Sequence, residues 1–165
     1  MTTIGTGMSN TYEIKHRWTG GVVYAGGGES LRDVVVQAVN DGASLAGAYL
    51  ADSNLAGAYL AGANLVDAYL AGANLTGARI NNGHALIGKR PVLQLGPIGS
   101  RCALLSAYLT DAGVMIRAGC FFGTLDEFRD ACIETHGESV HGREYAAAIT
   151  LIETHAELWS QEVSQ

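Results

Sequence analysis

A strict five-residue period runs through residues 43–82 of the 165-residue chain. Leucine recurs at every fifth position from Leu45 to Leu75, and Ile80 completes a series of eight units. A small residue, alanine or serine, precedes each of them by two positions. An α-helix repeats its faces every 3.6 residues and a β-strand every 2, so a period of five suits neither element. The period therefore predicts a repeat architecture over this segment.

The pattern of a small residue, a variable residue and a leucine resembles the pentapeptide-repeat family, and all eight units match it. The resemblance implies a right-handed quadrilateral β-helix in which four units form one square turn and the leucines point inward. Eight units then form two coils, in which Leu45 stacks on Leu65 and Leu50 on Leu70. At the ordinary spacing of β-strands two coils are only about 10 Å tall, so flanking segments are expected to cover their ends.

The N-terminal flank, residues 1–42, predicts a hairpin and a capping helix. Apolar and charged residues alternate over 12–18, which is typical of a strand, and a turn at 19–21 leads to a return strand. Three glycines at 26–28 are expected to break that strand. Ser30, with Asp33 three residues on, forms a capping-box pattern that starts a helix.

The C-terminal flank, residues 83–165, predicts a second hairpin and two helices. A short strand begins at Pro91, and a hairpin across a turn at 110–113 places Ser106 opposite Arg117. Residues 119–123 are expected to close that strand. Thr124 then caps a helix, and the last helix follows a turn over 138–142. The fold class is thus mainly β with α, and the repeats form the middle of three parts.

The charge of the chain is unevenly distributed. Residues 83–123 carry four basic residues against one acid, whereas residues 124–165 carry nine acids against two arginines. Glycine-rich turns at 96–101 and 123–127 add free backbone N–H groups and hydroxyls to this basic segment, which together suit a phosphate group. The predicted ligand-binding residues are Ser100, Arg101, Arg117 and Thr124 for the phosphate and Tyr108 for stacking a base. Alternatively, the glycines only make turns and the arginines pair with the acidic last third.

The residue before each repeat leucine is expected to face outward. An offset of twenty residues places Tyr49 under Tyr69 on one face and Tyr59 under Arg79 on the opposite face. Exposed tyrosines of this kind mark a contact surface, or else the flanking hairpins pack on them. Both interpretations stay open at this point.

Two groups of residues suggest chemistry by residue type alone. Cys120, His136, His141 and Asp130 suggest a Cys–His nucleophilic site, and Cys132 with His136, His141 and His155 suggests zinc. The spacing supports neither group, so we expect no metal, no cofactor and no enzymatic activity. Three cysteines, no secretory leader and no apolar run of 18 residues favour a cytoplasmic protein.

The order of the parts is similar to that of short pentapeptide-repeat proteins carried by phages. That similarity implies action on host molecules in the host cytoplasm, including sequestration of nucleotide second messengers as counter-defence. We therefore expect a non-catalytic homo-oligomer that binds a small anionic ligand resembling a linear or cyclic nucleotide. The alternative is a protein–protein interaction module acting on a host protein through Tyr49, Tyr59, Tyr69 and Arg79.

Some functions are not expected. Mimicry of duplex DNA needs a long acidic rod, whereas the repeats are short and carry only two acids and one base. The chain is acidic, with no long basic stripe, so direct binding of nucleic acid is not expected. A membrane partner is not expected either.

Overall fold

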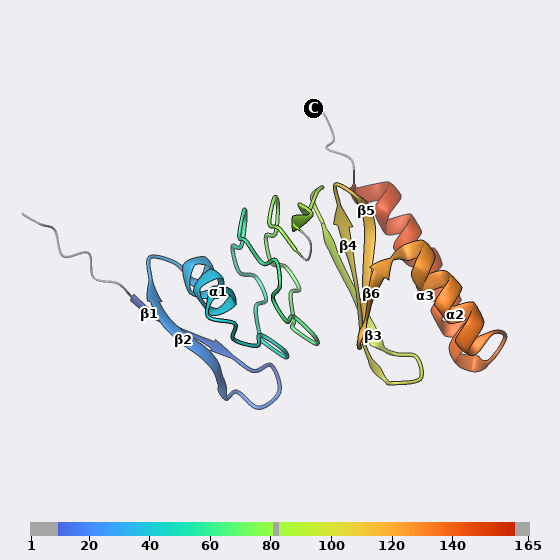
Figure 1. Ribbon diagram of the computed structural model, residues 1–165, viewed down its shortest axis with the longest axis horizontal. Helices are drawn as coiled ribbons and strands as arrows, with labels where there is room; N and C mark the ends of the chain where they lie inside the picture. Colours follow the sequence, from blue (N-terminus) through green and yellow to red (C-terminus); the bar gives the residue numbers. More distant parts are fainter. Residues whose placement is uncertain (1–9, 81–82, 161–165) are drawn as a thin grey trace, which may run out of the picture.

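The computed structural model describes residues 10–80 and 83–160. The N-terminal hairpin and one helix lie at one end, the repeats lie in the middle, and a four-stranded sheet with two helices lies at the other end (Figure 1). Residues 81–82, at the end of the predicted repeats, lie outside the described residues. The elements are β1 (Asn10–Lys15), β2 (Val22–Gly28), α1 (Leu31–Asn40), β3 (Val92–Ile98), β4 (Ala103–Thr110), β5 (Gly113–Ala118), β6 (Phe121–Thr124), α2 (Leu125–His136) and α3 (Val140–Trp159).

The N-terminal hairpin and α1 cover one end of the repeats. β1 and β2 pair antiparallel, and the predicted capping box of Ser30 and Asp33 is present at the start of α1. Val34, Val35 and Ala38 of α1 are buried in the same core cluster as the repeat leucines. The helix therefore supplies the apolar surface that so short a stack of repeats needs at its open end.

The expectation that glycines 26–28 break the return strand was wrong, because β2 continues through Gly28. A side chain at Gly26 would place its Cβ 2.5 Å from Gln37 Oε1 and 3.3 Å from Val34. The glycine therefore allows β2 to lie close against α1, and it does not end the strand.

The repeats form a β-helix-like region. The leucines from Leu45 to Leu75 are all buried, as the period predicts. Isolated parallel bridges join positions twenty residues apart, and backbone hydrogen bonds such as Leu50 N–H to Tyr69 O, at 2.9 Å, connect them. The bridged pairs are Tyr49–Tyr69, Asn54–Asn74 and Tyr59–Arg79.

A second regularity explains the glycines and aspartates of the repeats. The residue two places after each leucine turns the chain, and at every one of these positions from 47 to 77 it has a positive φ. Five of these residues are glycines, and the other two are Asp52 and Asp67, with φ of 55° and 56°. Glycine adopts this left-handed conformation without cost, and aspartate tolerates it better than most residues. The repeat is thus defined by its turn residue as well as by its leucine.

β3, β4, β5 and β6 form one antiparallel sheet in that order. The predicted pairing of Ser106 with Arg117 is confirmed. The repeats lie on one face of this sheet and both C-terminal helices on the other (Figure 1). Tyr108 and Met115 belong to the core shared with the repeats, whereas Ala107 and Ile116 belong to the core shared with α2 and α3. Neighbouring residues of one strand therefore serve two separate cores.

Two boundaries in this part differ from the expectation. Residues 119–123 do not close β5, because the chain turns at Gly119, with a φ of 59°, and returns as β6. The last helix begins at Val140, before Gly142, and Ser139 is its N-cap. Gly142 therefore lies inside the helix, where a Cβ would approach Gly137 O to 1.9 Å. The glycine permits close packing of the two helix ends, which its sequence position alone does not reveal.

Candidate functional site

A cavity of about 210 Å³ lies between the sheet and α2, beneath the turn that joins β3 to β4. Its wall is mainly apolar and includes two aromatic rings, Phe121 and Phe128. The polar groups of its lining come from the turn, from the β5–β6 connection and from both helices. They are Ser100, Arg101, Cys120, Cys132, Thr135, His136 and Tyr145. A mainly apolar cavity with a few convergent polar groups is the usual form of a small-molecule site.

The β3–β4 turn is held in place by α3. Gly99 N–H donates a hydrogen bond of 2.7 Å to Glu144 Oε2, and Cys102 N–H donates one of 3.1 Å to Gly99 O. Gly99 has a φ of 70°, and a Cβ at this position would lie 1.9 Å from the Tyr145 hydroxyl oxygen. Only glycine therefore fits here. Its close packing on Tyr145 fixes the backbone from which Ser100 and Arg101 extend.

Arg101 is the cation of this site. Its Nη1 lies 3.4 Å from Cys120 Sγ across the mouth of the cavity. Within residues 10–80 and 83–160, Arg101 forms no ion pair with a carboxylate. An exposed guanidinium beside a hydroxyl and an apolar wall is available to an anion.

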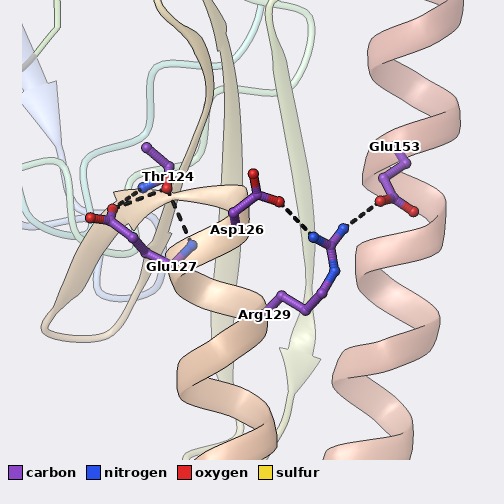
Figure 2. Close-up of polar contacts among 5 residues, drawn as sticks. All are labelled: Thr124, Asp126, Glu127, Arg129 and Glu153. Carbon is purple, nitrogen blue, oxygen red and sulfur yellow. Dashed lines mark hydrogen bonds and ion pairs between the residues drawn. The ribbon is translucent and has the colours of Figure 1, made fainter.

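The basic segment and the acidic helices do not neutralise one another in the described part of the chain. The acidic residues that do pair on the helices, Asp126 and Glu153, both bind Arg129, which lies on α2 itself (Figure 2). No ion pair joins a basic residue of 83–123 to an acid of 124–160. The described residues therefore do not show the alternative arrangement, in which these arginines pair with the acidic last third of the chain.

His136 lies in the last turn of α2 and forms part of an aromatic cluster at the cavity. Its ring centroid is 5.4 Å from that of Tyr145 and 6.1 Å from that of His141. Phe128 meets Tyr145 edge-on at 5.6 Å. These contacts arrange the rings of α2 and α3 around one side of the cavity.

Tyr108 and Arg117 lie on the opposite face of the sheet from this cavity. Tyr108 is 3% exposed and belongs to the core shared with the repeats. Burial raises the pKa of its phenol, while Ser106 and Arg117 act in the opposite direction. The expected role of Tyr108 as a stacking surface for a ligand does not fit this burial. The Arg117 guanidinium lies over the Phe122 ring, 5.0 Å from its centroid.

The backbone N–H and the hydroxyl of Thr124 are already hydrogen-bonded, because this residue caps the N-terminus of α2. Its backbone N–H and hydroxyl donate to Glu127 Oε2 at 2.7 and 3.1 Å, and Glu127 N–H donates to its hydroxyl at 3.2 Å (Figure 2). The Glu127 carboxylate thus takes the position at the helix N-terminus where an anion would bind. The five predicted ligand residues therefore do not form one site, and only Ser100 and Arg101 line the cavity.

The predicted tyrosine faces differ from each other. Tyr49 and Tyr69 stack with ring centroids 5.6 Å apart. The N-terminal hairpin adds Arg17, whose guanidinium lies 5.0 Å from the centroid of Tyr69 and 4.6 Å from that of Trp18. We call Arg17, Trp18, Tyr49 and Tyr69 the aromatic surface. Trp18 is 66% exposed and Tyr49 52% exposed.

On the other predicted face, Tyr59 is exposed and Arg79 donates from Nη1 to Gly83 O at 2.9 Å. No aromatic ring stacks on Tyr59 among the described residues. The face that carries Tyr49 therefore has more aromatic side chains in contact with one another than the face that carries Tyr59.

The residues considered for other chemistry are only partly brought together. Cys120 and His136 line the same cavity, whereas Asp130 does not. Among the residues that the structure describes, no group of three or more His, Cys, Asp or Glu side chains could hold a metal ion. Burial raises the pKa of the Cys132 thiol. The four residues considered for zinc thus do not form a site.

Together, these features define a protein in which a β-helix-like repeat region is flanked by two unlike end structures. Residues 42–82 match the model of the family described as pentapeptide repeats, in eight copies. The resemblance of this segment to the pentapeptide-repeat family, noted in the sequence, is confirmed. Repeats of this family generally serve as structural or interaction modules rather than as enzymes. Comparisons with curated proteins and with solved structures gave no significant match.

Within 10–80 and 83–160, no helix has both the length and the apolar character needed to cross a bilayer.

Proposed function

We propose that the protein is a non-catalytic binding protein that holds a small anionic, nucleotide-like ligand in the cavity beneath the β3–β4 turn. The observation that carries this proposal is the Arg101 guanidinium, which has no carboxylate partner among the described residues and lies at the mouth of an aromatic-walled cavity. Arg101 and the Ser100 hydroxyl would hold a phosphate. Phe121, Phe128 and Tyr145 would contact the apolar part of the ligand.

The size of the cavity limits the ligand. Sites for drug-sized molecules have volumes of about 300–1,000 Å³, and this cavity has about 210 Å³. A single base or one sugar phosphate suits that volume better than a whole dinucleotide. The Glu144 carboxylate accepts the Gly99 N–H, and among the described residues it forms no ion pair with Arg101.

Two further parts of the proposal concern the fold of the repeats and the biological setting of the protein. The bridges at an offset of twenty residues support two coils of a quadrilateral, right-handed β-helix. The similarity to short phage proteins supports sequestration of a nucleotide in the host cytoplasm as the use of the site.

The test is calorimetric titration of the protein with a panel of linear and cyclic nucleotides. The variants are Arg101→Ala and, as a matched control, Arg143→Ala, an exposed arginine that does not line the cavity. We expect binding to be lost in Arg101→Ala and kept in Arg143→Ala, with unfolding free energies within about 1 kcal/mol of the wild type. The proposal fails if no nucleotide binds and native mass spectrometry of the purified protein detects no retained small molecule.

A second candidate function is supported by the aromatic surface. An exposed tryptophan and a stacked tyrosine pair around one arginine have the composition of a protein-interaction hot spot. On this reading the protein binds a host protein through Arg17, Trp18, Tyr49 and Tyr69. Trp18→Ala should abolish capture of a partner from host lysate, and Tyr59→Ala on the other face should leave it intact. Equal capture by both variants would reject this function.

A further inference from the structure

β3 is an edge strand whose outer side is unpaired. It is first in the sheet order, and no backbone hydrogen bond joins residues 92–98 to any segment but β4 among the described residues. A groove of about 650 Å³ runs beside its first half, between residues 89–94 and residues 69–73 of the repeats. An unpaired edge of this length is a template for pairing with another strand.

α3 runs antiparallel along β3 and is attached at both ends of the strand. At the end of β3, the Gly99 N–H donates to Glu144 Oε2 at 2.7 Å. At its beginning, His155 Nε2 lies 2.9 Å from Arg90 O, and the Arg90 guanidinium packs over the Trp159 ring at 4.3 Å. Glu144 and His155 therefore mark the flank of α3 that faces the edge strand.

This flank carries an exposed apolar stripe. Its four residues are Val140, Ala147, Leu151 and Leu158, spaced by seven, four and seven positions. The three large ones are between 49% and 66% exposed. They share a helix face with Glu144 and His155, because they lie three, four or seven residues from one of these two.

α2 packs against the other flank of α3, where Arg129 bonds to Glu153. The stripe is therefore not covered by α2. An apolar stripe with this spacing is typical of a helix that packs on another helix.

The charges along the edge are self-complementary. Lys89 and Arg90 lie just before β3, and Glu144 lies at its end. When such a strand pairs antiparallel with its own copy, the start of each strand lies across from the end of the other. The basic start of one copy then faces Glu144 of the other, twice, about a two-fold axis.

We infer that β3 and the α3 stripe form an isologous interface between two copies of this chain. The two β3 strands pair antiparallel into a continuous eight-stranded sheet, and the two α3 helices pack across the axis. Gly96 and Pro97 lie at the exposed end of the strand, and proline offers no N–H to a ladder, so the paired segment centres on residues 92–95. This inference does not depend on the ligand cavity.

The first test is sedimentation equilibrium of the full chain at micromolar concentration, with folding followed by circular dichroism. We expect a mass twice the 17.2 kDa of one chain. The double variant Leu151→Glu, Leu158→Glu should sediment as a folded monomer. Ile133→Glu, an equally exposed apolar residue on α2, is the control and should remain a dimer. A monomeric wild type, or a dimer that survives the double variant, would overturn the inference.

The second test uses the predicted symmetry. Arg90→Glu and Glu144→Lys each place like charges across the axis in a homodimer and should each be monomeric. In an equimolar mixture each contact between positions 90 and 144 becomes an opposite-charge pair, so heterodimers should form. Their formation can be detected by native mass spectrometry. A mixture that remains monomeric while both variants are folded would contradict the proposed pairing of Arg90 with Glu144.

Discussion

Arg129 of α2 donates a hydrogen bond of 2.5 Å to Glu153 of α3. The same guanidinium bonds to Asp126 at 2.6 Å, so one arginine joins its own helix to the next (Figure 2). We expect a double-mutant cycle of Arg129→Ala and Glu153→Ala to give a coupling energy of about 0.5–1 kcal/mol, because both side chains are more than a third exposed. The coupling should fall as salt is added. Urea unfolding of the wild type, the two single variants and the double variant measures this coupling energy. A coupling energy near zero at low salt would contradict the prediction.

The second prediction concerns the repeat core. Leu60 is buried among the other repeat leucines, so Leu60→Asp would bury a carboxylate without a partner. We expect a loss of several kcal/mol in unfolding free energy, enough to unfold a domain of ordinary stability. Asn64→Asp introduces the same group at an exposed position of the neighbouring unit and should cost little. Thermal unfolding of both variants checks the difference, and similar melting temperatures would speak against the inward placement of Leu60.

Thr124 gives a third prediction, because a structural role and a ligand role have different consequences. Removal of its capping hydroxyl by Thr124→Ala should cost about 1 kcal/mol of unfolding free energy. Ligand affinity should stay unchanged, since Glu127 already takes the helix N-terminus. Thr150→Ala, within the exposed part of α3, is the control for loss of a hydroxyl. A variant of normal stability with weakened ligand binding would restore Thr124 as a ligand residue.

The fourth prediction concerns pH. Burial raises the pKa of Tyr108 above its ordinary value of 10.0. The folded state therefore keeps the phenolic proton to higher pH than the unfolded state, and the free energy of unfolding falls as pH rises from about 10 towards the folded pKa. Below that range the contribution is constant. Tyr108→Phe should lose less stability than the wild type above pH 10. Parallel pH profiles of the unfolding free energy for Tyr108→Phe and the wild type would refute this prediction.

Local signals in the sequence predicted the elements that depend on neighbouring residues. The leucine period defined the repeats, and the capping boxes at Ser30 and Thr124 placed two helix starts correctly. The short turn after Thr110 fixed the register of Ser106 and Arg117. In each of these cases the determining residues lie within a few positions of one another.

The features that were missed depend on contacts that form only when separate elements pack together. The roles of Gly26 and Gly142 follow from Gln37 and from Gly137, which become neighbours only when the elements pack. The cavity combines Arg101 with His136 because α2 covers that face of the sheet. Arg101 was predicted and His136 was considered for other chemistry, but residue type gave no reason to join them. Nor did the alternation in β4 show which face would meet the repeats and which the helices.

The constant offset of twenty residues between paired repeat positions bears on how a chain of this kind can change in length. An insertion of four further units restores every pairing and leaves both ends facing as before. An insertion of one unit shifts Tyr49 off Tyr69 and turns one end relative to the other. Natural variants are therefore expected to gain or lose repeats in steps of four. Each step would move the N-terminal hairpin and the sheet apart or together by about 4.8 Å, the spacing of adjacent strands.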